Sequence, residues 1–161
     1  MGRTDVATRL IPAPPERVYA ALVDPAALEV WLPPSGMSGR FERFDLSPGG
    51  GYRLVLAYDD PALDGKSRAN EDVVEARFVA IVPGERIVQA IDFIADDPAL
   101  AGTMTMTWSV TPAEGGALAE IRADDVPEGI SAADHATGMS SSLEHLADYL
   151  AEASLRTAPG E

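Results

Sequence analysis

Two histidines and no cysteine limit the chemistry available to this sequence of 161 residues. His135 precedes Met139 and Leu143 by four and eight residues, so a helix would turn all three side chains toward the same apolar neighbour. His135 is then either a hydrogen-bonded core histidine or a polar anchor, with acid–base capacity, at one end of a cavity. His145 falls on the opposite side of the same helix, where we expect it to meet solvent.

Two further polar residues fall within apolar strand patterns. Asp72 shares the parity of Val74 and Phe78, so it is either a solvated strand end or an inward-pointing carboxylate. A buried carboxylate needs a partner, and His135 is the partner we expect for an inward Asp72. Such a pair could polarise a carbonyl group of a bound molecule. Gln89 has the parity of a pocket hydrogen-bonding group, although its strand is apolar on both faces.

Other catalytic and metal-binding patterns are missing from the sequence. There is no HExxH or GxSxG pattern, and two histidines on opposite helix faces form no zinc set. The glycines at 49–51 precede a strand pattern, which favours a hairpin turn over a phosphate-binding loop. We therefore expect no metal and no cofactor.

The overall charge excludes whole classes of partner. Lys and Arg total 12 against 26 Asp and Glu, which gives a net charge of −14 and argues against nucleic acid or an anionic membrane surface as partner. With 46% hydrophobic and 24% charged residues, the chain has the composition of a globular protein. We expect one domain over residues 1–156 with a frayed tail at 157–161. The lack of cysteine, of a leader sequence and of a long apolar run favours a cytoplasmic location.

The elements that must position these residues follow from periodicity and from turn residues. A strand over 6–12 is followed by a helix over 15–23 with Pro15 at its start, and then by a short helix over 26–31 with Asp24 as its cap. The pattern then changes from helical spacing to alternation. It predicts strands over 41–46, 52–58, 72–82, 86–94, 103–111 and 117–125, a mobile loop over 59–71, and one amphipathic helix over 131–153.

The clearest alternation lies in the strand over 103–111. Met104, Met106 and Trp108 alternate with threonines, so we expect the apolar row to face the terminal helix and the threonines to face water. Because the threonine row is uncharged and favours β-structure, we also expect it to meet a second copy of the chain in a symmetric homodimer.

The order of these elements predicts an α+β fold. Strand, two short helices, about six further strands and a long helix leave no place for parallel βαβ units. We expect a curved antiparallel sheet of 6–7 strands wrapped round the terminal helix, with the two short helices closing one end and a cavity between sheet and helix.

Six segments of the chain, in their order and spacing, are typical of one fold: Ile11–Tyr19, Asp24-Pro25, Trp31, Asp45 with Pro48–Gly50, Pro83–Val88 and Gly138–Leu150. With these segments the chain resembles the START-like (SRPBCC) superfamily, which has the helix-grip fold of the birch-pollen allergen. Within this superfamily, the chain is similar to the branch of activators of the heat-shock chaperone ATPase and to a subgroup of bacterial members. The family commonly has Trp after the helix glycine, where this chain has Met139.

The resemblance implies either a ligand-binding function or a protein contact. The leading hypothesis is a binder of a small hydrophobic or aromatic molecule, with lyase- or cyclase-like chemistry resting on His135 and Asp72. The alternative is a co-chaperone-like interaction module with a filled core and an exposed apolar patch. Flexible methionines and a concave sheet favour the cavity. Its expected lining is Trp31, Tyr52, Leu54, Leu56, Asp72, Phe78, Gln89, Met104, Met106, Trp108, His135, Met139 and Leu143.

Overall fold

The computed structural model describes residues 3–59, 71–94 and 102–156. The predicted loop over 59–71, except for its two end residues, and the predicted tail over 157–161 lie outside the described residues.

The structure confirms the α+β fold and the order of its elements. Seven antiparallel strands and three helices are described, and none of these helices has the length and apolar character of a membrane span. The elements are β1 (Arg3–Ile11), α1 (Pro15–Val23), α2 (Pro25–Trp31), β2 (Met37–Asp45), β3 (Gly51–Tyr58), β4 (Glu71–Val82), β5 (Arg86–Ile94), β6 (Thr103–Ala113), β7 (Gly116–Val126) and α3 (Ala132–Arg156).

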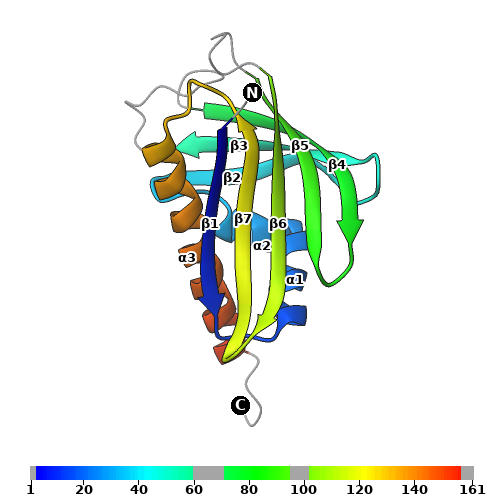
Figure 1. Ribbon diagram of the computed structural model, residues 1–161, viewed down its shortest axis with the longest axis vertical. Coiled ribbons are helices and arrows are strands. Elements are labelled where there is room, and N and C mark those ends of the chain that lie inside the picture. The colour runs from blue at the N-terminus through cyan, green and yellow to red at the C-terminus, as the bar shows by residue number, and fades with distance from the viewer. Residues whose placement is uncertain (1–2, 60–70, 95–101, 157–161) are drawn as a thin grey trace.

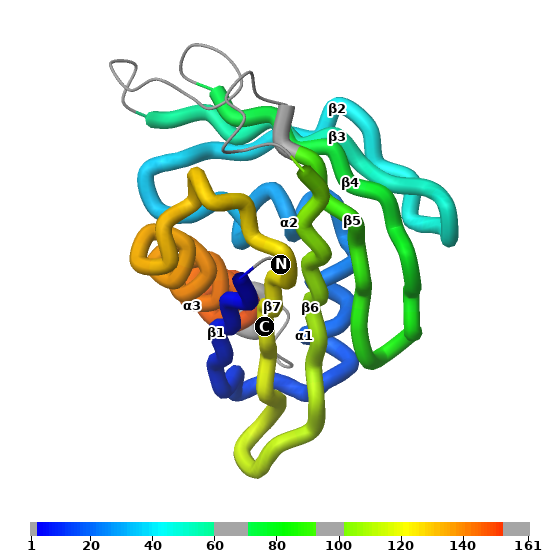
Figure 2. Tube along the Cα trace, turned by 45° about the horizontal axis from the view of Figure 1, so that its top comes forward, coloured from blue at the N-terminus to red at the C-terminus, as the bar shows by residue number. Residues whose placement is uncertain are grey.

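The strands form one curved sheet that bends around α3. The strand order is β1-β7-β6-β5-β4-β3-β2, so the first and second strands of the chain are the two edges. β1, β7 and β6 run along the long axis of the molecule, and β2 and β3 cross it at one end (Figure 1). α3 lies on the concave side, with α1 and α2 on the same side of the sheet (Figure 2). The long helix therefore buries its apolar face against the sheet, as predicted.

The register of β6 is the predicted one. Met104 and Trp108 are buried, whereas Thr103 is exposed and Thr105 and Thr107 are partly exposed. Because successive side chains alternate between the two faces, this pattern fixes which row faces the helix.

Two strands begin earlier than their sequence patterns indicate. β1 begins at Arg3 rather than at residue 6, and β2 begins at Met37 rather than at residue 41. β2 pairs with β3 from Met37 onward, so ladder hydrogen bonds extend the strand across Gly39, which has little strand preference of its own. A Cβ atom at Gly39 would lie 2.8 Å from the Pro33 ring, so this position needs glycine for the close approach.

The two short helices are joined by a capped corner. Asp24 ends α1 and accepts a hydrogen bond from the backbone N–H of Ala26 at 3.1 Å, which confirms its predicted role as the cap of α2. Trp31, at the end of α2, donates from Nε1 to the carbonyl oxygen of Ala21 in α1 at 2.9 Å. Its ring meets that of Trp108 edge-on, with 5.6 Å between centroids, and so joins the helix pair to the sheet.

Candidate functional site

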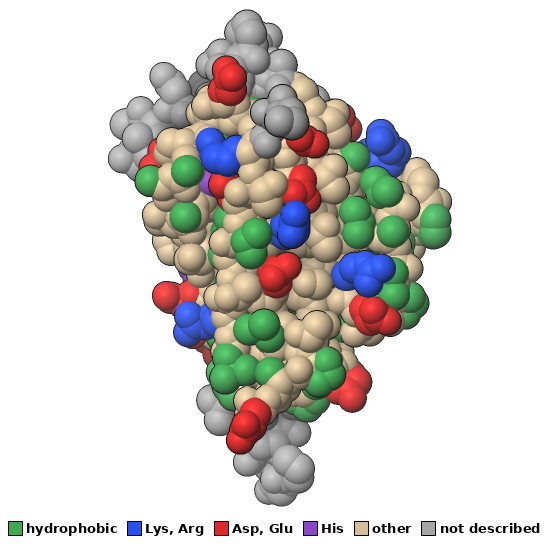
Figure 3. Space-filling view, in the orientation of Figure 1, with side chains coloured by type: hydrophobic (Ala, Val, Ile, Leu, Met, Phe, Trp, Pro, Cys, Tyr) green, Lys and Arg blue, Asp and Glu red, His purple; other side chains and the backbone are tan. Residues whose placement is uncertain are grey.

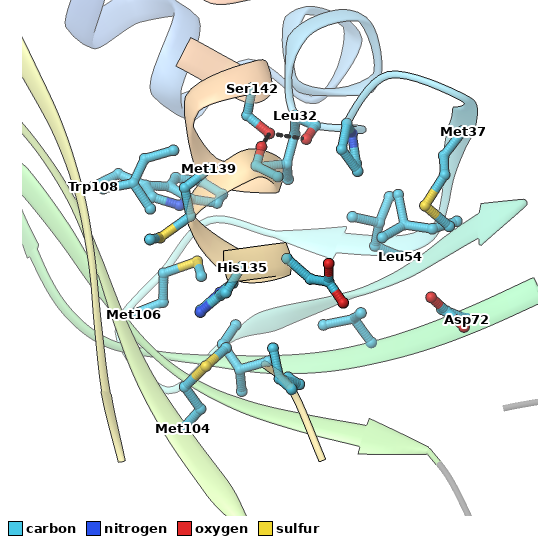
Figure 4. A pocket seen from close by; sticks show the side chains of 18 of the residues that line it. Leu32, Met37, Leu54, Asp72, Met104, Met106, Trp108, His135, Met139 and Ser142 are labelled. Carbon is cyan, nitrogen blue, oxygen red and sulfur yellow. Dashed lines mark hydrogen bonds between the residues drawn. The ribbon is translucent and has the colours of Figure 1, made fainter. Parts of the chain in front are cut away.

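A cavity of about 280 Å³ lies between the first half of α3 and the concave face of the sheet. Its walls come from β3, β4, β5, β6 and β7, from α3, and from the loops that precede β2 and α3. In Figure 4, Met104, Met106 and Trp108 line one side, while Leu54 and Met37 line another. Most of the lining is apolar, and the polar side chains on it are few enough to consider one by one.

The cavity brings together most of the predicted site residues. Those on its lining are Tyr52, Leu54, Leu56, Asp72, Met104, Met106, Trp108, His135 and Met139. Trp31, Phe78, Gln89 and Leu143 are buried but do not line the cavity. They pack behind the wall: Phe78 lies against Tyr52, with 5.7 Å between centroids, and Gln89 binds the Tyr52 hydroxyl.

Sequence reasoning missed the loop residues on the lining. Leu32 and Pro34 come from the connection between α2 and β2, and Met37 is the first residue of β2. Ile130 lies in the loop before α3, and Asp134 lies in the first turn of that helix. A loop has no periodicity to show which of its side chains point inward, so only the three-dimensional closure of the sheet reveals them.

His135 is held by a hydrogen bond to the first strand. Its Nδ1 lies 2.8 Å from Oδ2 of Asp5, and the two side chains are only 13% and 10% exposed. Arg3 binds the same carboxylate, with its Nε 2.9 Å from Oδ1, and also donates to the carbonyl oxygen of Ile130 at 2.6 Å. β1 therefore fastens both the loop before α3 and the first turn of that helix.

Asp5 determines which nitrogen of His135 carries the proton. The hydrogen bond from Arg3 is the main reason why the pKa of Asp5 lies below its usual value, and the hydrogen bond from His135 adds to this lowering against the opposing effect of burial. The carboxylate is then an acceptor only, so Nδ1 of a neutral His135 is the donor and Nε2 carries a lone pair.

The predicted partnership between His135 and Asp72 is wrong, because Asp5 takes that place. Asp72 does point inward, however, with 2% of its surface exposed. Its Oδ2 accepts a 3.4 Å hydrogen bond from the hydroxyl of Tyr58. Figure 4 shows Asp72 on the β4 side of the cavity, across from the first turn of α3. Asp72 and His135 thus line one cavity without forming a pair.

Two buried hydrogen-bond donors near the cavity lack a partner within the described residues. Tyr52 donates its hydroxyl proton to Oε1 of Gln89 at 2.6 Å, but Nε2 of Gln89 has no acceptor. Nε1 of Trp108 has none either, and Trp108 lines the cavity. Burial also raises the pKa of Tyr52, so its hydroxyl stays protonated.

His145 is not solvent-exposed as predicted but half-buried under the loop before β2. Its Nδ1 lies 3.0 Å from the carbonyl oxygen of Pro33, and its Nε2 lies 3.2 Å from Oγ of Ser35. Ser141 accepts a hydrogen bond from the backbone N–H of Ser35 at 2.8 Å. These contacts fasten the loop to α3, and none of these residues lines the cavity described above.

The described part of the chain contains no group of three or more His, Asp or Glu residues arranged to hold a metal ion. The polar side chains on the described lining are one imidazole, two carboxylates, an indole and hydroxyl groups.

Residues 12–151 match the family model described as Activator of Hsp90 ATPase homolog 1-like protein. The chain belongs to this family. The match begins after the edge strand β1, and it spans the other six strands and most of α3. All the described lining residues of the cavity therefore lie within the part of this Hsp90-activator-like chain that matches the family. No curated protein matches the chain.

Solved structures share the fold of this Hsp90-activator-like chain over almost its full length. A protein from Chromobacterium violaceum is 33% identical, with a TM-score of 0.79 over 90% of this chain and 94% of that one. A protein from Rhodobacter sphaeroides is 25% identical, with a TM-score of 0.75 over 94% and 96% of the two chains. The AHSA1 protein from Silicibacter pomeroyi is 20% identical, with a TM-score of 0.76 over 94% and 99%, and this likeness concerns the fold alone.

Proposed function

We propose that the protein binds a small, mainly apolar, aromatic molecule in the cavity between the sheet and α3. The observation that carries this proposal is a cavity of about 280 Å³ with an apolar lining and a buried donor, Nε1 of Trp108, that lacks an acceptor within the described residues. Ligand sites are typically apolar hollows in which a few polar groups fix orientation. The volume lies at the lower end of the range for such sites, so the ligand is small.

The walls favour a flat molecule. Tyr52 and Trp108 lie nearly parallel, with an interplanar angle of 19° and 6.4 Å between centroids. Met104, Met106 and Met139 add flexible, polarisable side chains, which adapt to an aromatic ring. A lyase- or cyclase-like reaction on such a molecule would need an acid–base group, and His135 supplies one on the lining.

The experiment is a fluorescence titration with N-phenyl-1-naphthylamine, a neutral apolar probe that brightens in dry sites. We expect saturable binding that falls about tenfold or more in Met139→Trp, because the larger indole occupies part of the cavity. The matched control is Val79→Trp, which adds the same ring at a side chain that is 55% exposed on β4. Equal binding by the parent and by both variants would overturn the proposal.

A second candidate function is contact with a chaperone, and the match to a family named for an activator of the Hsp90 ATPase favours it. Leu10 and Leu118 are register partners on β1 and β7, and both are exposed on the outer face of the sheet together with Val6. Figure 3 shows hydrophobic side chains over this part of β1 and β7. We expect the ATPase rate of a purified Hsp90 to change on adding the chain, and Leu10→Asp to abolish the change.

The homodimer through the outer face of β6 also stays a proposal, as does a cytoplasmic location. The threonine row supports the dimer, but charged neighbours flank it: Thr103 pairs with Asp92, Thr105 with Asp124 and Thr107 with Arg122. We expect sedimentation at micromolar concentration to show a dimer that Thr105→Lys dissociates. A parent protein that sediments as a monomer would contradict this assembly.

A further inference from the structure

We infer that the cavity selects a neutral aromatic molecule bearing a phenolic or enolic hydroxyl group, which donates its proton to Nε2 of His135. This inference rests on the proposed ligand-binding function and names the class of ligand. It starts from the contact between His135 and Asp5, which sequence reasoning did not foresee.

The first step concerns the direction of the hydrogen bond. Asp5 is engaged by Arg3 and His135 and does not line the cavity, whereas His135 does. Because a carboxylate only accepts, Nδ1 of the neutral imidazole donates toward β1. The remaining ring nitrogen, Nε2, then acts as an acceptor. Figure 4 shows the imidazole pointing from α3 toward Met104 and Met106, so the ring lies among apolar neighbours. A ligand carbonyl, which accepts only, does not fit this nitrogen, whereas a hydroxyl group does.

The second step concerns charge. Asp72 and Asp134 line the cavity, and no Lys or Arg occurs among its described lining residues. A carboxylate or phosphate ligand would lose its hydration in this mainly apolar site and gain no cation from the described lining. A neutral hydroxyl group avoids this cost. The acceptor at His135 and the absence of Lys and Arg from the described lining therefore point to the same ligand chemistry.

The third step concerns the rest of the ligand. Tyr52 and Trp108 present stacked rings, and the indole N–H of Trp108 is buried and lacks a partner within the described residues. An aromatic ring with a second oxygen that only accepts, such as a ketone, would complement both features. The ligand class is thus a phenol or enol that also carries a carbonyl oxygen.

The same geometry allows a balanced proton transfer. The ligand O–H bond breaks, its electron pair stays on the oxygen, and Nε2 of His135 takes the proton. The resulting imidazolium lies between the ligand oxyanion and the carboxylate of Asp5, which Arg3 also binds. Return of the proton regenerates the starting state, so no oxidant or further reactant is required. Asp72 and Asp134 are the other titratable side chains on the described lining, apart from the Tyr52 hydroxyl.

The test compares 6-acetyl-2-naphthol with its methyl ether, which has the same rings and ketone but no hydroxyl proton. Both are titrated in the same buffer at the same pH. We expect the naphthol to bind about tenfold more tightly than the ether, the amount that one hydrogen bond in a dry site contributes. In His135→Phe the two should bind equally. In His145→Phe, the matched control outside this cavity, the tenfold preference should remain.

The variant Asp5→Asn tests whether Asp5 fixes the proton position on the His135 imidazole or only packs against it. An amide can donate to Nδ1 as well as accept from it, so the imidazole is no longer fixed with its lone pair on Nε2. We expect the preference for the naphthol to shrink while N-phenyl-1-naphthylamine still binds, which shows that the cavity persists. The same probe verifies that His135→Phe has folded.

Three outcomes would overturn the inference. They are equal binding of naphthol and ether by the parent, a preference that survives in His135→Phe, and no binding of the naphthol. If N-phenyl-1-naphthylamine still binds in those cases, the proposed function stands and only the ligand class is wrong. If that probe does not bind the parent either, both fail.

Discussion

The side chains of Tyr52 and Gln89 form a buried pair in which the Tyr52 hydroxyl group is the hydrogen-bond partner of the Gln89 amide. The two side chains are 1% and 0% exposed and joined at 2.6 Å, and Nε2 of Gln89 is already without a partner among the described residues. We expect Tyr52→Phe to cost about 1–3 kcal/mol of the free energy of unfolding, because the whole Gln89 amide then lies buried and unpaired. Urea denaturation measures this loss.

The control is the double variant Tyr52→Phe with Gln89→Met, in which both polar partners are apolar. It should lose less than the sum of the two single changes, because no polar group is left unpaired. Additive losses would mean that the hydrogen bond contributes no coupling.

We expect Asp5 to make the free energy of unfolding depend on pH in the acidic range. Its folded-state pKa is lowered, so the stabilisation it provides is complete above its unfolded pKa of about 3.9 and is lost as the pH falls through the lower folded value. We expect the free energy of unfolding to fall between about pH 5 and pH 2, and to fall less steeply in Asp5→Asn. Denaturant titrations at several pH values measure both slopes, and parallel slopes would contradict the role assigned to Asp5.

The sequence predicted where the Asp72 and His135 side chains point, but it did not predict which residue His135 binds. The inward direction of Asp72 and the apolar surroundings of His135 follow from parity and helical spacing, which are local properties. The partner of His135 lies 130 residues away on an edge strand, and only the pairing of β1 with β7 brings it there. Local patterns contain no information on that distance.

At the scale of elements, α3 uses one face to hold the loop that lines the cavity. Ser142 donates from Oγ to the carbonyl oxygen of Leu32 at 2.6 Å and is 5% exposed. We expect Ser142→Ala to lower the free energy of unfolding by about 1 kcal/mol or more, because the Leu32 carbonyl loses its partner. Ser140→Ala is the matched control, since Ser140 is exposed on the same helix, and it should change the free energy of unfolding by much less. If Ser142→Ala and Ser140→Ala lowered the stability equally in a thermal melt, the hydrogen bond from Ser142 would have no special role.

Elements with strong periodicity were predictable, and elements held by their neighbours were less so. α3 and β6 follow their apolar patterns closely. The first residues of β2 form a strand because β3 supplies hydrogen-bond partners, as the pairing of Met37 with Tyr58 shows. His145 was expected to meet solvent because a helical wheel shows only the helix itself, and the loop over 33–35 covers it.

The charge of the whole molecule gives a prediction that no single residue would. A net charge of −14 places like charges over the surface of a compact chain and destabilises it by self-repulsion. We expect the Tm to rise as NaCl increases from about 0.01 M to about 1 M, over which the Debye length falls from about 30 Å to about 3 Å. A Tm that falls with salt would mean that surface ion pairs, such as Arg53 with Glu42, outweigh the repulsion.

The arrangement of the tryptophans has a consequence for spectroscopy. The chain has two, Trp31 and Trp108, and they meet edge-on at 5.6 Å, so their indole chromophores lie close enough for their excited states to couple. Only Trp108 touches the cavity, yet excitation energy passes between the two rings, so the emission of the pair reports on one place in the molecule. Near-ultraviolet circular dichroism of the unlabelled protein should therefore show a paired exciton signal that changes when the cavity is filled. Trp31→Phe should abolish the paired signal and leave one indole as the reporter of occupancy.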